Sequence, residues 1–87
     1  MTLLETQKNL LRALAEHRRI SDLPMEMAEL YRRAFAADAV PLNVRDALQV
    51  LISRRYIDPV WSRSDVISAA ITSPGERYLE LLLTDDN

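Results

Sequence analysis

Apolar residues in the first part of the chain recur every three or four positions, which is the spacing of an amphipathic helix. Thr2 and Glu5 form a capping-box pattern at its start, because a hydroxyl and a carboxylate three residues apart can bond amides that a first helical turn leaves unpaired. The pattern predicts a helix from residue 3 to about His17. Arg18 and Arg19 follow, and their charge suits the negative end of the helix dipole.

A second helix is predicted after a short connection. Ile20 stands alone between polar residues, which suits a single bridge at the edge of a sheet. Asp22 is a good N-cap and Pro24 fits the first turn, and apolar residues between positions 27 and 35 then recur at helical spacing. The stretch 38–41 ends this helix, because the residue before a proline avoids helical geometry.

A third helix is predicted from Asn43, a suitable N-cap, to about Arg54 and Arg55. At about 100° per residue, its apolar positions gather on one inner face. That face consists of Val44, Ala47, Leu48, Leu51 and Ile52. The opposite, exposed arc consists of Arg45, Asp46, Gln49, Val50 and Ser53.

Beyond residue 55 the pattern changes to the β-branched and aromatic runs that are typical of strands. Runs over 56–61 and 66–71 flank a polar turn and predict a hairpin. Pro59 restricts the first strand to a sheet edge or a bulge. Trp61 is expected to pack against the third helix and to anchor the hairpin in the core; stacking on a nucleotide or a partner is the alternative.

A last helix is predicted to begin at Ser73 as N-cap, with Pro74 in its first position. Tyr78 and the leucines that follow it supply an apolar stripe at helical spacing. The tail, residues 84–87, is expected to fray.

This order of elements resembles that of the winged helix-turn-helix family of DNA-binding domains. Residues 43–57 are similar to the family's recognition helix and its first wing strand, residues 71–79 to the second wing strand running into a terminal helix, and residues 19–21 to a short first strand. The resemblance implies a mainly α fold with a small β-hairpin, in the order helix, short strand, helix, helix, strand, strand, helix. It implies one winged-helix domain over residues 1–87, with an ordered core from 3 to 83.

Composition narrows the function. The 87 residues carry a net charge of −2, which by itself does not indicate a nucleic-acid binder. The charge is uneven, because residues 44–63 hold four arginines and two aspartates, whereas residues 64–87 hold one arginine and five acids. We therefore expect basic charge on the third helix and the wing.

The chain offers little for catalysis. It has no cysteine, one histidine (His17) and one glycine, so neither a metal site nor a glycine-rich phosphate loop is expected. We predict that the protein is not an enzyme and uses no cofactor or metal. Its start lacks a secretory pattern and no apolar run reaches the roughly 18 residues of a membrane span, so a cytoplasmic location without a membrane partner is expected.

The resemblance implies that the partner is double-stranded DNA and that the function is transcription regulation. On the exposed arc, arginine can pair with guanine and glutamine with adenine in the major groove. Arginines at the helix end and in the wing lie where the family contacts phosphates. The predicted DNA-binding residues are Arg45, Gln49, Ser53, Arg54, Arg55 and Arg63.

A homodimer is expected because the apolar arc of the last helix is wider than one intramolecular contact requires. The predicted dimer interface consists of Leu3, Leu4, Leu11, Tyr78, Leu79, Leu82 and Leu83. The alternative function is a protein–protein interaction module that keeps the winged-helix scaffold without sequence-specific DNA binding. Asp46 on the reading arc and the short wing favour that alternative.

Overall fold

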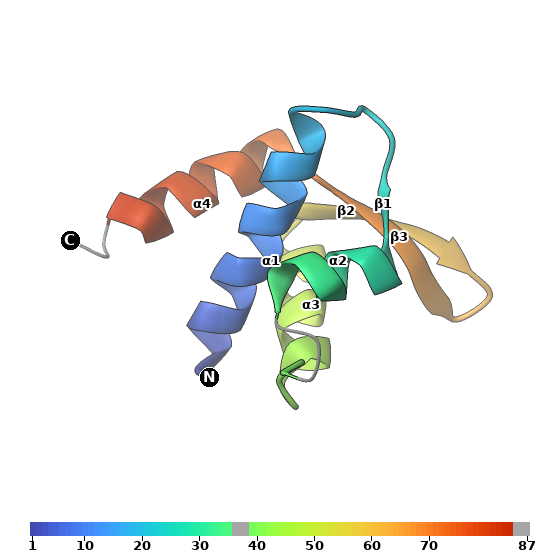
Figure 1. Cartoon of the computed structure of the whole chain (residues 1–87), viewed down its shortest axis with the longest axis horizontal. Helices are drawn as coiled ribbons and strands as arrows, with labels where there is room; N and C mark the ends of the chain where they lie inside the picture. Colours follow the sequence, from blue (N-terminus) through green and yellow to red (C-terminus); the bar gives the residue numbers. More distant parts are fainter. Residues whose placement is uncertain (36–38, 85–87) are drawn as a thin grey trace.

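Four helices and three strands follow one another in the order that the sequence predicts. The structure, a computed structural model, describes residues 1–35 and 39–84. The elements are α1 (Leu3–Arg18), β1 (Met25–Glu26), α2 (Met27–Ala34), α3 (Val44–Ser53), β2 (Ile57–Ser62), β3 (Asp65–Ile71) and α4 (Ser73–Thr84) (Figure 1).

The strands form one antiparallel sheet in the order β1-β3-β2, so the last strand in the chain lies in the middle. Met25 of β1 pairs with Ala69, and Ile57 of β2 pairs with Ile71. Pro59 lies in the edge strand β2, as predicted, because an edge strand tolerates a residue without an amide hydrogen. The β2–β3 hairpin projects past the helices on one side, and α4 extends on the opposite side (Figure 1).

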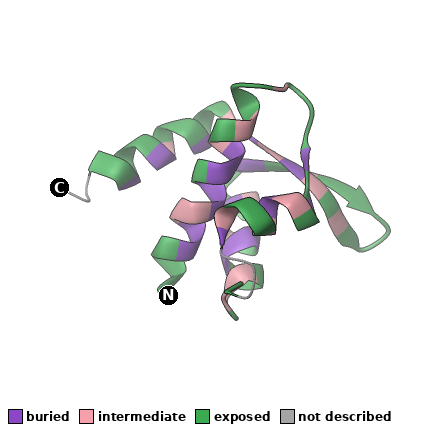
Figure 2. Ribbon diagram, viewed as in Figure 1, coloured by how far each residue is buried: buried purple, intermediate pink, exposed green. Residues whose placement is uncertain are grey.

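The core lies between α1 and the elements around it. Helix α1 packs against α2, α3, α4 and β3, and its buried leucines are central to the cluster (Figure 2). The buried apolar side chains are Leu10, Leu11, Ala13, Leu14, Met25, Met27, Leu30, Phe35, Ala47, Leu48, Leu51, Ile57, Ala69, Ile71, Leu79 and Leu82. These side chains come from all seven elements and form a single hydrophobic core.

The predicted N-cap side chain is present at the start of α1 but not at the start of α3. The Thr2 hydroxyl accepts the amide of Glu5 at 3.1 Å, which confirms the predicted cap of α1. Asn43 stands at the N-cap position of α3, but its side chain does not cap the helix. Its Oδ1 instead accepts the hydroxyl of buried Thr6 at 2.8 Å, and its Nδ2 donates to the Met1 carbonyl at 3.2 Å. The Asn43 side chain therefore joins the start of α1 to the start of α3 instead of capping α3.

The predicted first strand is misplaced. Ile20 is 74% exposed and lies in the turn that ends α1, where its amide donates to the His17 carbonyl at 3.0 Å. The strand forms instead at Met25–Glu26, because the Met25 side chain is buried in the core and its backbone pairs with Ala69. Helix α2 consequently begins at Met27 with Glu26 as N-cap, and not at Asp22.

Two predictions for the second half of the chain also need correction. Trp61 is 55% exposed, so it does not anchor the hairpin in the core. Thr72, and not Ser73, precedes α4 as its capping residue, since the Thr72 hydroxyl accepts the Gly75 amide at 3.0 Å. Thr84 of the predicted frayed tail is the last residue of α4, and residues 85–87 lie outside the described part of the chain.

The start of α4 is tied to the end of α3 by a very close backbone approach. The Thr72 hydroxyl donates to the Arg55 carbonyl at 2.7 Å, and the Thr72 amide donates to the Tyr56 carbonyl at 3.1 Å. A Cβ atom at Gly75 would lie 2.1 Å from the same Tyr56 oxygen. The only glycine of the chain is therefore required here, because any side chain would collide with backbone.

A Gly75→Ala variant is expected to lower the free energy of unfolding by roughly 2–4 kcal/mol, because the opposing atom is a backbone oxygen that cannot rotate away. Urea denaturation would measure the change. Ser73→Ala is the matched control: Ser73 is exposed in the first turn of α4, and its replacement should change stability by no more than about 0.5 kcal/mol. Equally small losses in both variants would contradict the close approach.

Candidate nucleic-acid interface

The outer face of α3 matches the predicted arc. Ala47, Leu48 and Leu51 are buried, which turns the opposite side of the helix toward solvent. Arg45, Gln49 and Ser53 are exposed there, one above another at the spacing of successive helical turns. Val50, also predicted on this arc, is half-buried, and Asp46 is exposed. The helix thus presents two groups that can pair with base edges, together with one carboxylate.

Arg45 lies on the first turn of α3 beside α2. Burial raises the pKa of Tyr31 in α2, and the positive charge of Arg45 partly opposes that rise. The Arg45 guanidinium makes no ion pair or hydrogen bond with any residue of the described chain. Its side chain is exposed at the surface of α3.

The end of α3 adopts a Schellman motif. The Tyr56 amide donates to the Leu51 carbonyl at 2.9 Å, and the Arg55 amide donates to the Ile52 carbonyl at 3.0 Å. This arrangement places Arg55 in the left-handed region with φ of 62°, where glycine is usual. Arg54, at the C-cap, keeps a φ of −89°. Both side chains are exposed at the junction of α3 and β2.

The hairpin closes through a two-residue turn, Arg63 and Ser64, next to the paired residues Ser62 and Asp65. Arg63 has a φ of 58°, whereas Ser64 does not have a positive φ. A positive φ at the first turn position alone is the sign pattern of a type II′ turn, in which glycine is preferred at that position. The exposed Arg63 side chain is thus held at the tip of the hairpin.

Arg55 and Arg63 are the two described non-glycine residues with positive φ. That conformation costs a non-glycine residue roughly 1–2 kcal/mol. Strained positions of this kind often persist where the side chain has a function. Both are predicted phosphate contacts, and neither guanidinium has a partner within the described chain.

Other arginines are satisfied within the protomer. Arg33 bonds Glu29 at 2.7 Å and Arg32 bonds the same carboxylate, so hydrogen bonds from Arg33 and then Arg32 lower the pKa of Glu29. Arg18 donates to the Ile71 carbonyl at 2.8 Å and pairs with Glu76 at 3.2 Å. These three arginines stabilise the domain and leave less charge for a ligand.

The surface around α3 and the hairpin is only modestly positive. Arg45, Arg54, Arg55 and Arg63 share these elements with Asp46, Asp58 and Asp65, all of them exposed. The arginines are concentrated at the end of α3 and at the turn of the hairpin. The aspartates lie elsewhere: Asp46 is one helical turn from Gln49 on α3, and Asp58 is on β2. An anion would therefore be held by separate arginines and not by one deep basic patch.

The predicted dimer residues differ in burial and fall into three groups. Leu11, Leu79 and Leu82 are buried in the core of the protomer, so they are not available to a second chain and their assignment is wrong. Tyr78 is half-buried, stacks on Tyr56 with ring centroids 4.4 Å apart, and donates to Gln7 Oε1 at 3.2 Å.

Leu3, Leu4 and Leu83 remain exposed, and Leu81 on α4 is 63% exposed. Helical spacing identifies the apolar positions of α1 and α4, but it does not distinguish a side chain that packs inside the protomer from one that faces outward.

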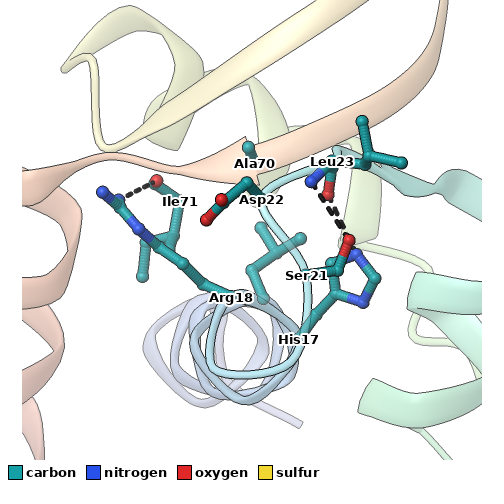
Figure 3. A pocket seen from close by; sticks show the side chains of 8 residues that line it. His17, Arg18, Ser21, Asp22, Leu23, Ala70 and Ile71 are labelled. Atoms are coloured by element: carbon teal, nitrogen blue, oxygen red, sulfur yellow. Dashed lines mark hydrogen bonds between the residues drawn. The ribbon is translucent and has the colours of Figure 1, made fainter.

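A separate hollow lies where α1 ends beside β3 (Figure 3). His17 Nε2 lies 2.9 Å from the Leu23 carbonyl, and the Leu23 amide donates to the Ser21 hydroxyl at 3.1 Å. The volume of this hollow, about 250 Å³, is below the roughly 300–1,000 Å³ of typical ligand sites. These polar groups hold the connection between α1 and β1, and the hollow is a weaker candidate than the surface of α3.

Comparisons of the chain with protein-family models, with curated proteins and with solved structures found no match. Within residues 1–35 and 39–84, no helix is both long and apolar enough to cross a membrane, and no three metal-ligating side chains come together. Function therefore has to be inferred from the surface that α3 and the hairpin present.

Arg55→Gly is expected to raise the free energy of unfolding by up to about 1 kcal/mol, because glycine adopts the required positive φ without a Cβ penalty. The larger entropy of glycine in the unfolded chain offsets part of the gain. Arg54→Gly is the matched control, since its φ of −89° offers no such relief. Urea denaturation of both variants would measure this, and greater stabilisation by Arg54→Gly would contradict the assigned backbone geometry.

Proposed function

We propose that this protein is a winged helix-turn-helix domain that binds double-stranded DNA and regulates transcription. The order of its elements and the strand order β1-β3-β2 support the proposal, because a hairpin next to an exposed helix is what such a domain requires. In this reading α2 and α3 form the helix pair, α3 enters the major groove and β2–β3 is the wing.

Base contacts would come from the outer arc of α3. Arg45 can donate two hydrogen bonds to guanine, and Gln49 can pair with the N6 and N7 edge of adenine. They lie one helical turn apart, so they would address neighbouring base pairs. Ser53 lies one turn further on and can donate to a base or a phosphate. Asp46 on the same helix would accept from a cytosine amino group or disfavour other sequences.

Phosphate contacts would come from Arg54 and Arg55 at the end of α3 and from Arg63 at the tip of the hairpin. The observation that carries the proposal is that Arg55 and Arg63 hold guanidinium groups at positive-φ positions where glycine would be less strained. Three such contacts give a slope of log affinity against log salt of about −3. A protein with a net charge of −2 can therefore still bind DNA at low salt.

A protein–protein interaction module is the second candidate function. It is favoured by Asp46 on the reading arc and by Leu42, which is fully exposed just before α3. An apolar residue at that place adds nothing to phosphate binding, but it suits a protein partner. The two functions differ in their response to salt, since only the DNA complex releases condensed counterions.

We also propose a homodimer in which the outer side of α4 and the start of α1 meet a second copy. Leu81 and Leu83 are exposed on α4, and Leu3 and Leu4 are exposed on α1. A symmetric pair of this kind would present two copies of α3 to half-sites about one helical turn of DNA apart.

Fluorescence anisotropy with a mixed-sequence duplex of about 20 base pairs tests the DNA proposal. Binding is expected at about 50 mM salt, with affinity falling about 40-fold by about 200 mM if three phosphates are contacted. No binding at the lower salt concentration would exclude this function and leave the protein-interaction alternative.

Arg45→Ala should relax the preference among sequences, since it removes a base contact. Arg63→Gly should weaken all sequences alike and reduce the magnitude of the salt slope by about one, since it removes a phosphate contact without straining the turn. Competition binding on a randomised duplex library compares the two. Identical effects of both variants on sequence preference would contradict the assigned roles.

Light scattering across a concentration series tests the dimer. The mass should rise toward twice the 10.0 kDa of one chain, and Leu81→Glu should prevent the rise by placing a charge in the proposed contact. Leu23→Glu, at an exposed leucine between α1 and β1, is the control and should still dimerise. A mass of one chain at the highest soluble concentration would exclude the interface.

A further inference from the structure

Trp61 is the only tryptophan of the chain, and it lies near the tip of the hairpin without becoming part of the core. Its 55% exposure leaves much of a large aromatic ring in water, which is unfavourable. Arg63 lies two residues further along the chain. The hairpin extends beyond the helices, so a side chain near its tip can reach a partner that also contacts α3 (Figure 1).

Alternation along β2 places Trp61 on the same side of the hairpin as buried Ile57, and a β-bulge on the neighbouring strand β3 brings Val66 opposite it. Val60 pairs with Ser68 and Trp61 pairs with Val66, so Ile67 is the additional residue on β3. Val66 packs against the core cluster, and its cross-strand partner Trp61 therefore lies on the same, inner face of the sheet.

The two faces of the hairpin differ in charge. Asp58 pairs with Ala70, and Asp65 pairs with Ser62. By strand alternation both carboxylates lie on the outer face, opposite the pair formed by Trp61 and Val66. The inner face near the tip thus has an aromatic ring, no carboxylate among these pairs, and Arg63 at the adjoining turn. A basic protein partner would favour the outer face, whereas a polyanion favours the inner one.

We infer that Trp61 makes an apolar contact with the deoxyribose and base edges of double-stranded DNA, next to the groove that α3 enters. This inference rests on the proposed function and assigns a second, non-ionic role to the hairpin. Arg63 supplies charge to a phosphate, and Trp61 supplies contact area that releases no counterions. Burial of the exposed part of a tryptophan side chain removes enough apolar area from water to change affinity about tenfold.

The emission of Trp61 reports on the contact directly, since no other tryptophan contributes. Acrylamide quenching of the intact chain should fall at least twofold on saturation with a duplex of about 20 base pairs at low salt. In anisotropy titrations, Trp61→Ala should weaken binding about tenfold without changing the salt slope, and Trp61→Phe should retain most of the affinity. Arg63→Gly should instead reduce the slope.

Ile20→Ala is the control, because Ile20 is an exposed apolar residue on a different part of the surface and should not affect binding. Thermal melting of each variant separates loss of contact from loss of fold. If DNA binds but quenching of Trp61 is unchanged, or if Trp61→Ala binds as tightly as the original chain, this inference is wrong and the proposed function stands.

Absence of DNA binding at low salt overturns both the proposed function and this inference. Protection of Trp61 that grows with protein concentration in the absence of DNA would assign the hairpin to contact with a second copy, and it would also overturn the DNA contact.

Discussion

The arrangement of the second half of the domain depends on the approach of the Gly75 backbone to the Tyr56 carbonyl. A Cβ atom would be 2.1 Å from that oxygen, so the approach is possible only for glycine. Thr72 completes the junction, because its hydroxyl donates to the Arg55 carbonyl and accepts the Gly75 amide. The end of α3, the base of the hairpin and the start of α4 are thereby joined at one point, which fixes the position of α3 relative to the hairpin.

A second set of contacts holds α4 against α1. Arg18 bonds the last carbonyl of β3 and the Glu76 carboxylate, and the Tyr78 hydroxyl donates to buried Gln7. These polar contacts satisfy groups that would otherwise be costly near the core. Only one side of α4 packs against the rest of the protomer, so Leu81 on its other side stays exposed. The same contacts that fix α4 therefore create the apolar surface from which a dimer is proposed.

Local pattern predicts most of this fold and less of its surface. Helical periodicity identified four helices, their order with the strands, and the outward arc of α3, because burial follows a 3.6-residue period. The first strand was misplaced because Ile20 and Met25 are both isolated apolar residues. The choice between them depends on pairing with Ala69, more than 40 residues away in sequence. A local pattern contains no information about that pairing.

Prediction of the candidate site from the sequence is limited for the same reason, because the burial of a side chain depends on contacts that are distant in sequence. Trp61 is predicted in the core because aromatic residues usually bury their area, but it lies near the tip of a hairpin that extends beyond the helices, and the sequence does not show how far the hairpin projects. Leu11, Leu79 and Leu82 were assigned to a dimer because an apolar stripe looks alike whether it packs inside a protomer or between two. The unusual backbone of Arg55 and Arg63 also had no sequence signal, since glycine and not arginine marks such positions.

Net charge alone is therefore a poor guide to the partner of this domain. The sheet separates its charges by strand alternation, so that Asp58 and Asp65 lie on one face of the hairpin and Trp61 on the other. Glu76 at the start of α4 pairs with Arg18 of α1, away from the tip of the hairpin. A total of −2 thus conceals exposed arginines at two separate places, the end of α3 and the turn of the hairpin. Because these positive sites are few, nonionic contacts by Gln49 and Trp61 would have to supply a larger share of any DNA affinity than in a strongly basic domain.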